Sequence, residues 1–259
     1  MASKVLTWGV NGYPTCPLRG CDNDVAAVAE LARGLAHFDP SSNLRQLLDG
    51  DATAANVIDA MRWLVDGVGP GEFAILHHSG HGATAAIDGV AQDVICPVDF
   101  DWTPQHWISA DDCVTILSAL NPAARLFWLA DCCHSGNLDE QGRDVPPAGI
   151  KSFPPPAGFA AQTSAGRRAG AALRSLGSGG RLPVAFVSAC TSAQTAADAV
   201  IAGRPCGAFT TYFLQALRQE SPATPVASTA ADAASLLQQN GYSQNPVASG
   251  CWAGLPFPR

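Results

Sequence analysis

Two short stretches of this sequence combine histidine, cysteine and glycine in a way that suits nucleophilic chemistry. The first is HHSGHG at residues 77–82, and the second is DCCHSG at residues 131–136. A thiol attacks strongly at neutral pH only when a base removes its proton or its surroundings lower its pKa. Histidine can do both, because its own pKa lies near neutral pH. We therefore expect His81 to be the base for a cysteine of the second stretch. A backbone N–H of Gly82, or one near Gly136, is expected to face the oxyanion.

The elements that must position these stretches are short apolar runs and amphipathic segments in alternation. Such alternation predicts an α/β fold with a mainly parallel sheet. Strands are expected at residues 4–9, 43–48, 72–78, 125–130 and 184–189, and helices at 22–35, 53–65, 111–120, 207–218 and 229–239. Each chemical stretch directly follows an expected strand. In parallel sheets the residues beyond the strand carboxyl ends line one crevice, which would bring the two stretches together.

Composition limits the class of protein. The 259 residues are 47% hydrophobic, enough for one large domain or two small ones. A net charge of −7 gives no reason to expect nucleic acid or an anionic membrane as partner, and it suits cationic ligands. There is no signal peptide pattern, and no run of about 18 apolar residues that would span a membrane. Nine cysteines, an odd number, indicate a cytoplasmic protein with reduced thiols.

Residues 139–183 differ from the rest of the chain. They are rich in proline, glycine, alanine and serine, and they contain Arg167, Arg168, Arg174 and Arg181. A stretch of this length without clear structure is usually a functional loop or a disordered linker. Both interpretations remain open here: a surface insertion, or a processing loop that offers these arginines for cleavage.

Other interpretations of the two stretches also remain open. A zinc site would draw on His77, His78, His81, Cys132, Cys133 and His134. His77 and His81 have the i, i+4 spacing of paired zinc ligands, but they lie in a glycine-rich turn after a strand, where that spacing does not align their side chains. Cys132 and Cys133 would alternatively both fill the core, and at least one of them is expected to do so because neighbouring strand residues alternate faces. A third possibility is an inactive scaffold or binding module.

Five stretches, in order, resemble the metacaspases, which have the caspase-hemoglobinase fold. They are LRGCDND at 18–24, the stretch at 77–82, VICPVDF at 94–100 with ISADD at 108–112, the stretch at 131–136, and VSAC at 187–190 continuing to GAFT at 207–210. The resemblance implies a single caspase-like domain over 1–259, a three-layer sandwich with a mainly parallel central sheet flanked by helices. It divides the chain into a large-subunit-like region (1–138), a flexible linker or processing loop (139–183) and a small-subunit-like region (184–259).

The same resemblance implies a function. The nucleophile would be Cys133, which immediately precedes His-Ser-Gly, with His81 as base and with Gly82 and Cys133 N–H groups binding the oxyanion. The pocket for P1, the residue before the scissile bond, would be lined by Cys21, Asp24, Ser79 and Asp131. Two carboxylates favour arginine or lysine and repel aspartate. The prediction is a cysteine endopeptidase that cleaves after Arg or Lys. An Asp-specific caspase-like peptidase, a transpeptidase and a catalytically silent scaffold are the alternatives.

Metacaspases often need Ca²⁺, and the resemblance implies a site for it. The candidate ligands are Asp99, Asp111, Asp112 and one of Asp139 and Glu140. Oxygen ligands suit Ca²⁺, but Asp111 and Asp112 would equally favour the start of a helix. No organic cofactor is expected. The expected partners are protein or peptide substrates with a basic P1 residue, and the expected state is a monomer that cleaves itself after the arginines of 139–183.

Overall fold

The computed structural model describes the whole chain except residues 1, 134–148, 155–183, 192–193 and 259. Its centre is a six-stranded sheet of order β12-β9-β7-β3-β1-β2. The strands are β1 (Lys4–Gly9), β2 (Leu44–Leu48), β3 (Phe73–Ser79), β7 (Arg125–Asp131), β9 (Val184–Ser188) and β12 (Val247–Ser249). All neighbours pair in parallel except β12, which runs antiparallel to β9. The expected α/β fold with a mainly parallel sheet is confirmed.

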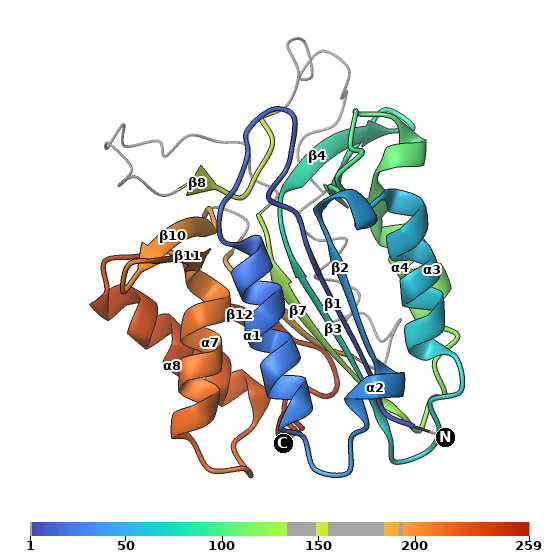
Figure 1. The fold of residues 1–259 in the computed structure, drawn as a ribbon, viewed down its shortest axis with the longest axis vertical. Coiled ribbons are helices and arrows are strands. Elements are labelled where there is room, and N and C mark those ends of the chain that lie inside the picture. The colour runs from blue at the N-terminus through green and yellow to red at the C-terminus, as the bar shows by residue number, and fades with distance from the viewer. Residues whose placement is uncertain (1, 134–148, 155–183, 192–193, 259) are drawn as a thin grey trace.

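Helices cover both faces of this sheet and make three layers (Figure 1). On one face lie α1 (Cys21–Arg33), α7 (Ala208–Gln219) and α8 (Val226–Gln239), and on the other lie α3 (Ala54–Val65) and α4 (Ala110–Leu117). A single turn, α2 (Pro40–Asn43), precedes β2. Strand β7 shows why both layers are needed. Leu126 and Trp128 belong to the core cluster shared with α3 and α4, whereas Phe127 and Leu129 pack with Phe213 of α7. A strand buried on both faces cannot leave either one uncovered.

The helix boundaries follow local capping chemistry. Thr53 accepts a hydrogen bond from the Asn56 N–H at the start of α3, as the sequence predicts. Ser109 and Asp112 form a reciprocal capping box at the start of α4, so one carboxyl oxygen of Asp112 is engaged in capping. Helix α8 begins at Val226, three residues before the expected start, directly after Pro225 in an extended conformation.

Two antiparallel hairpins were not expected from the sequence. Strands β4 (Gly82–Ile87) and β5 (Val90–Ile95) pair around a turn at Asp88 and Gly89, and β6 (Ile108–Ser109) joins β5. Strands β10 (Ala197–Ile201) and β11 (Arg204–Gly207) pair around Ala202 and Gly203. Both turn pairs have positive φ, the geometry that suits a two-residue hairpin turn. The strands are rich in alanine, so their β-propensity is weak, but the Asp-Gly pair was a usable signal.

Part of the segment 139–183 is built into the fold, which corrects the interpretation of that part as a surface insertion. Residues Gly149–Ile150 form β8, which pairs antiparallel with β10 in a small sheet of order β11-β10-β8. The chain remains described as far as residue 154. The rest of the segment lies outside the described residues, and the division into three regions stays a prediction. Within the described part, no helix is long and apolar enough to cross a membrane.

Candidate functional site

The two chemical stretches meet at one edge of the central sheet. Strands β3 and β7 are parallel neighbours, and Ser79 pairs with Asp131 at their carboxyl ends. His81 and Cys133 each stand two residues beyond that pair. Both side chains are buried. The sequence-based expectation that the stretches converge is therefore met.

Two hydrogen bonds hold His81, one through its backbone N–H and one through its ring. Its backbone N–H donates to the hydroxyl oxygen of Tyr13 over 3.0 Å, and the Tyr13 hydroxyl donates to the carbonyl of Cys96 over 2.7 Å. The ring Nε2 lies 2.7 Å from the carbonyl oxygen of Cys16. A carbonyl only accepts, so Nε2 carries the hydrogen and Nδ1 carries the free lone pair. Among the described residues, Nδ1 has no hydrogen-bond partner of good geometry. The ring therefore presents its basic nitrogen without a competing donor.

Burial sets the protonation state of both groups. It lowers the pKa of His81 to about 4, although the backbone carbonyl of Cys16 acts in the opposite direction. It raises the pKa of the Cys133 thiol to about 12, although the backbone of Ala196 acts in the opposite direction. In this structure the pair at neutral pH is therefore a neutral imidazole and a neutral thiol, rather than an ion pair.

Lys151 fills the space beside this pair, and its side chain is fully buried. Its ammonium nitrogen lies 3.1 Å from Asp24 Oδ2 and 3.1 Å from Asp131 Oδ1, and it donates to the Ser79 hydroxyl over 2.8 Å. Burial lowers the pKa of Lys151, but Asp131 and Asp24 outweigh this effect and hold the pKa well above the usual value. The side chain is therefore a charged ammonium group in an acidic pocket. We use "acidic pocket" below for Cys21, Asp24, Ser79 and Asp131.

The carboxylates of the acidic pocket are fixed by donors from the start of α7. The Gly207 N–H donates to Asp24, over 2.8 Å to Oδ1 and 2.9 Å to Oδ2. Thr210 donates to Asp131 Oδ2 from its backbone N–H and, over 2.7 Å, from its hydroxyl. Burial raises the pKa of Asp24 to about 6, with Lys151 acting against that rise. The hydrogen bonds from Gly207 and Thr210 thus hold both carboxylates in position to bind one cation.

The backbone of Lys151 is held as firmly as its side chain. Its carbonyl oxygen accepts from the N–H of Gly82 over 3.2 Å and from the N–H of Cys133 over 3.1 Å. Its own N–H donates to the carbonyl of Ala196 over 3.0 Å. Two converging N–H donors on one carbonyl oxygen are what acyl-transfer enzymes use to stabilise an oxyanion. Gly82 and Cys133 are the two residues whose N–H groups the sequence predicts as oxyanion donors, and that role stays a prediction.

The other cysteines and histidines that the sequence suggests as site residues have separate surroundings in the structure. Cys21 is buried in the acidic pocket, where burial raises its pKa beyond the usual range of a thiol. His77 lies between the hydroxyls of Thr7, at 2.8 Å, and Thr210, at 3.3 Å, while His78 contacts Cys132 at 3.1 Å. Within the described residues no three His, Cys, Asp or Glu side chains gather as a metal site would need. His134 lies outside the described residues.

The predicted calcium ligands are only partly described. Asp99 accepts a hydrogen bond from the Ala54 N–H, and Asp112 caps α4, so both have local roles. Asp139 and Glu140 lie outside the described residues, as do Arg167, Arg168, Arg174 and Arg181. The described acids alone do not assemble a Ca²⁺ site. Calcium binding therefore stays a prediction, and no chemical step below depends on it.

Sequence reasoning missed Lys151, Thr210, the Cys16 carbonyl and Tyr13. Lys151 carried one signal: it is one of only two lysines in the chain, with Lys4, and it lies in a segment whose other basic residues are arginines. The Cys16 carbonyl left no signal, because a backbone atom acts there. Its residue has a φ of 59°, which only the fold reveals.

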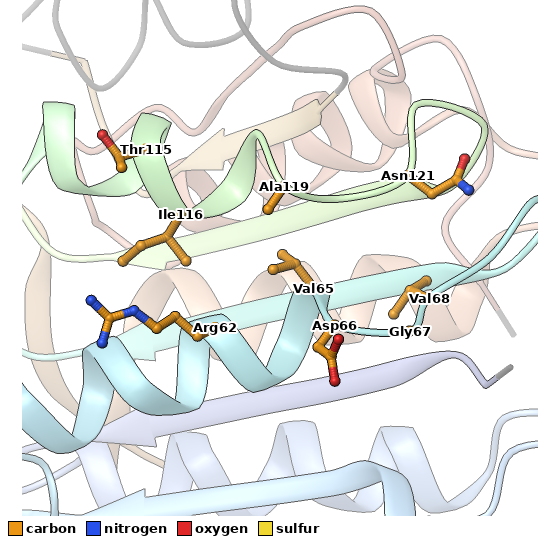
Figure 2. Close-up of a pocket in the computed structure, with 9 residues that line it drawn as sticks. All are labelled: Arg62, Val65, Asp66, Gly67, Val68, Thr115, Ile116, Ala119 and Asn121. Carbon is orange, nitrogen blue, oxygen red and sulfur yellow. The ribbon is translucent and has the colours of Figure 1, made fainter.

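A surface hollow lies apart from these residues. It measures about 650 Å³ between α3 and α4, and Figure 2 shows Arg62, Asp66 and Ile116 among its lining. None of the predicted site residues lines it. The chemistry-bearing side chains gather instead at the edge where β3 and β7 end.

These features define a class: an α/β protein in which a buried imidazole and a buried thiol follow two neighbouring parallel strands, and paired N–H donors bind one peptide carbonyl. Comparison with known families matches residues 3–140, more than half of the chain, to one described as metacaspase, peptidase C14 domain. The chain belongs to the metacaspase family of C14 peptidases.

Individual relatives agree with that assignment. Metacaspase-1 of Eremothecium gossypii is 34% identical over 147 residues, covering 52% of this chain and 32% of that protein. Metacaspase-1A of Aspergillus oryzae is 29% identical over 254 residues, covering 83% of this chain and 60% of that protein. The chain thus spans less than two thirds of the length of these relatives. A crystal structure of a Geobacter sulfurreducens protein matches with a TM-score of 0.71 at 18% identity, covering 100% of this chain and 98% of that one, which shows the fold.

Proposed function

We propose that this protein is a cysteine endopeptidase that hydrolyses peptide bonds after Lys or Arg. One observation carries the proposal: the chain's own Lys151 occupies the site in the manner of a substrate. Its ammonium group lies between Asp24 and Asp131, and its carbonyl oxygen accepts from the N–H groups of Gly82 and Cys133. An aspartate in the same pocket would face two carboxylates, which argues against an Asp-specific enzyme.

The mechanism follows from the positions of these groups. His81 Nδ1 takes the proton of Cys133, and the thiolate attacks the carbonyl carbon of the P1 residue. Negative charge develops on the carbonyl oxygen, where the Gly82 and Cys133 N–H groups stabilise it. His81 then gives its proton to the leaving amine, and the peptide bond breaks. Water, deprotonated by His81, hydrolyses the thioester and returns the thiol to Cys133.

The same geometry supports a proposal of self-cleavage at the Lys151–Ser152 bond. The arginines that the sequence suggests as cleavage points, at 167, 168, 174 and 181, lie outside the described residues, whereas the Lys151 carbonyl accepts from the N–H of Cys133. With the thiol pKa at about 12 and the imidazole pKa at about 4, proton transfer is unfavourable while this segment fills the site. Self-cleavage from this filled form is therefore expected to be slow.

A panel of fluorogenic peptides tests the function directly. We expect hydrolysis with Arg or Lys at P1, at least about 100-fold slower hydrolysis with Asp, and none by a Cys133→Ala variant. Running each reaction with and without Ca²⁺ tests the calcium prediction, and light scattering on the same preparation tests the expected monomer. Absence of any hydrolysis after Arg or Lys, with or without Ca²⁺, would favour a silent scaffold.

A further inference from the structure

Phe153 is the second residue after the bond that the proposed function identifies as scissile, and it is largely buried, with 7% of its surface exposed. Its ring centroid lies 4.4 Å from that of His81, 5.2 Å from that of Tyr13 and 5.2 Å from that of Phe100. The Tyr13 ring meets it edge-on, at 89°, and the Phe100 ring stacks on it, at 22°. Phe153 therefore sits in an aromatic pocket made by these three side chains.

The backbone fixes Phe153 in register with Lys151. Gly82 donates its N–H to the carbonyl of Lys151, and its own carbonyl accepts from the N–H of Phe153 over 2.9 Å. One glycine thus binds the residue before the scissile bond and the second residue after it. Any peptide that places a basic residue in the acidic pocket and its carbonyl at Gly82 would direct its second following residue, P2′, to the aromatic pocket.

The aromatic pocket comes from residues that also support the site. Tyr13 hydrogen-bonds the His81 backbone, and His81 is the proposed base. Phe100 has no such contact; it lies between Phe153 and Trp102, whose ring centroid is 4.8 Å from its own. Phe100 is therefore the wall of the pocket that can be removed with least effect on His81.

From this geometry we propose that the aromatic pocket of Tyr13, His81 and Phe100 is a P2′ subsite that selects aromatic side chains. The substrate class is then a peptide with Lys or Arg at P1 and an aromatic residue two positions after it. The proposal rests on the proposed function. Aromatic pairs in edge-on and offset-stacked geometry attract beyond their buried area, and a carboxylate at P2′ would lose its hydration against three rings. Bound P2′ rings also exclude water from His81.

The test uses internally quenched peptides built on Gly-Ile-Lys-Ser-Xaa-Pro, in which Xaa at P2′ is Phe, Leu, Ala or Asp. With the full chain, we expect kcat/KM for Phe to exceed that for Ala by about tenfold and that for Leu by a few-fold, with Asp lowest. A Phe100→Ala variant should bring the Phe to Ala ratio close to one, while Phe38→Ala, altered at a distant Phe38–Phe73 contact, should keep it. Because each ratio is measured on one preparation, a smaller folded fraction does not change it.

The outcomes separate the two proposals. If no peptide is cleaved after Lys, the proposed peptidase function fails. If all four are cleaved after Lys at equal rates, or if Leu equals Phe, the function stands and aromatic selection is overturned. If the Phe to Ala ratio survives in Phe100→Ala, selection does not arise in this pocket and the assignment of the subsite is overturned.

Discussion

The ammonium group of Lys151 is the cation that balances both carboxylates of the acidic pocket. An ammonium group with no exposed surface is stable only beside paired charges, and here Asp24 and Asp131 supply them. Removing the charge while the segment stays in place would leave two buried carboxylates unpaired, at a cost of about 3–5 kcal/mol. The chain can avoid that cost by releasing the segment and admitting water to the acidic pocket.

A Lys151→Met variant tests this reasoning. We expect it to hydrolyse an Arg-containing fluorogenic peptide without a lag, with an initial rate about tenfold above that of unprocessed wild type. Initial rates on freshly purified protein give the comparison.

The matched control for that variant is Lys4→Met, which alters the only other lysine. Lys4 donates to the carbonyl of Trp63, far from the site in sequence and fold, so wild-type kinetics are expected. An initial rate for Lys151→Met no higher than that of wild type would show that Lys151 does not restrain access to the site.

At the scale of elements, the junction of β11 and α7 closes the acidic pocket. A methyl group on Gly207 would overlap Asp131 Oδ2, the Lys151 ammonium nitrogen and Asp24 Oδ2. The glycine has φ of −70°, so its conformation is open to any residue and only the space forbids a side chain. The absence of a side chain at Gly207 lets two carboxylates and the ammonium group approach the backbone at this point.

We therefore expect Gly207→Ala to lower kcat/KM for Arg and Lys peptides by about 100-fold, since the methyl group displaces the P1 cation. Gly254→Ala is the matched control, because a methyl group there meets nothing within 4 Å. The measurement is steady-state kinetics on both variants. Wild-type kcat/KM in Gly207→Ala would contradict the placement of the P1 cation in the acidic pocket.

The elements also show what the sequence could and could not predict. Strands β3 and β7 are strongly apolar and end at the chemical stretches, so pattern alone predicts that His81 and one cysteine of the second stretch lie at one edge of the sheet. The choice of Cys133 over Cys132 comes from the family resemblance. Two of the partners of Lys151, Ser79 and Asp24, lie 72 and 127 residues away along the chain, and no local pattern encodes such contacts. The Tyr13 and Phe100 rings meet Phe153 for the same non-local reason. Pairing of the alanine-rich hairpins depends on tertiary context rather than propensity.

At the scale of the molecule, burying several histidines ties stability to pH. Burial lowers the pKa of His77 to about 3, with Asp131 acting in the opposite direction. Below its unfolded-state pKa of about 6.5, the unfolded chain binds a proton there that the folded chain does not, so stability is lost as pH falls towards about 3. The stabilisation that comes from keeping His77 neutral is fully present above pH about 6.5.

A His77→Gln variant isolates this effect when both proteins carry Cys133→Ala to prevent self-cleavage. We expect the free energy of unfolding of the histidine-containing protein to fall relative to the variant by about 1.4 kcal/mol per pH unit below pH about 6.5. All other ionisable side chains are the same in the two proteins. Urea unfolding from pH 7 to pH 4 gives the difference, and parallel profiles would mean that His77 titrates normally in the folded state.

The substrate-like seating of Lys151 is the claim on which the proposed specificity and the P2′ subsite depend. The most direct measurement is the N-terminal sequence and intact mass of fragments formed when the purified chain is incubated at neutral pH, beside Cys133→Ala. We expect a new N-terminus at Ser152 in the wild type and an intact Cys133→Ala chain. Hydrolysis of Arg peptides by a wild-type chain that stays uncut at Lys151, or is cut only after the arginines at 167, 168, 174 or 181, would contradict it.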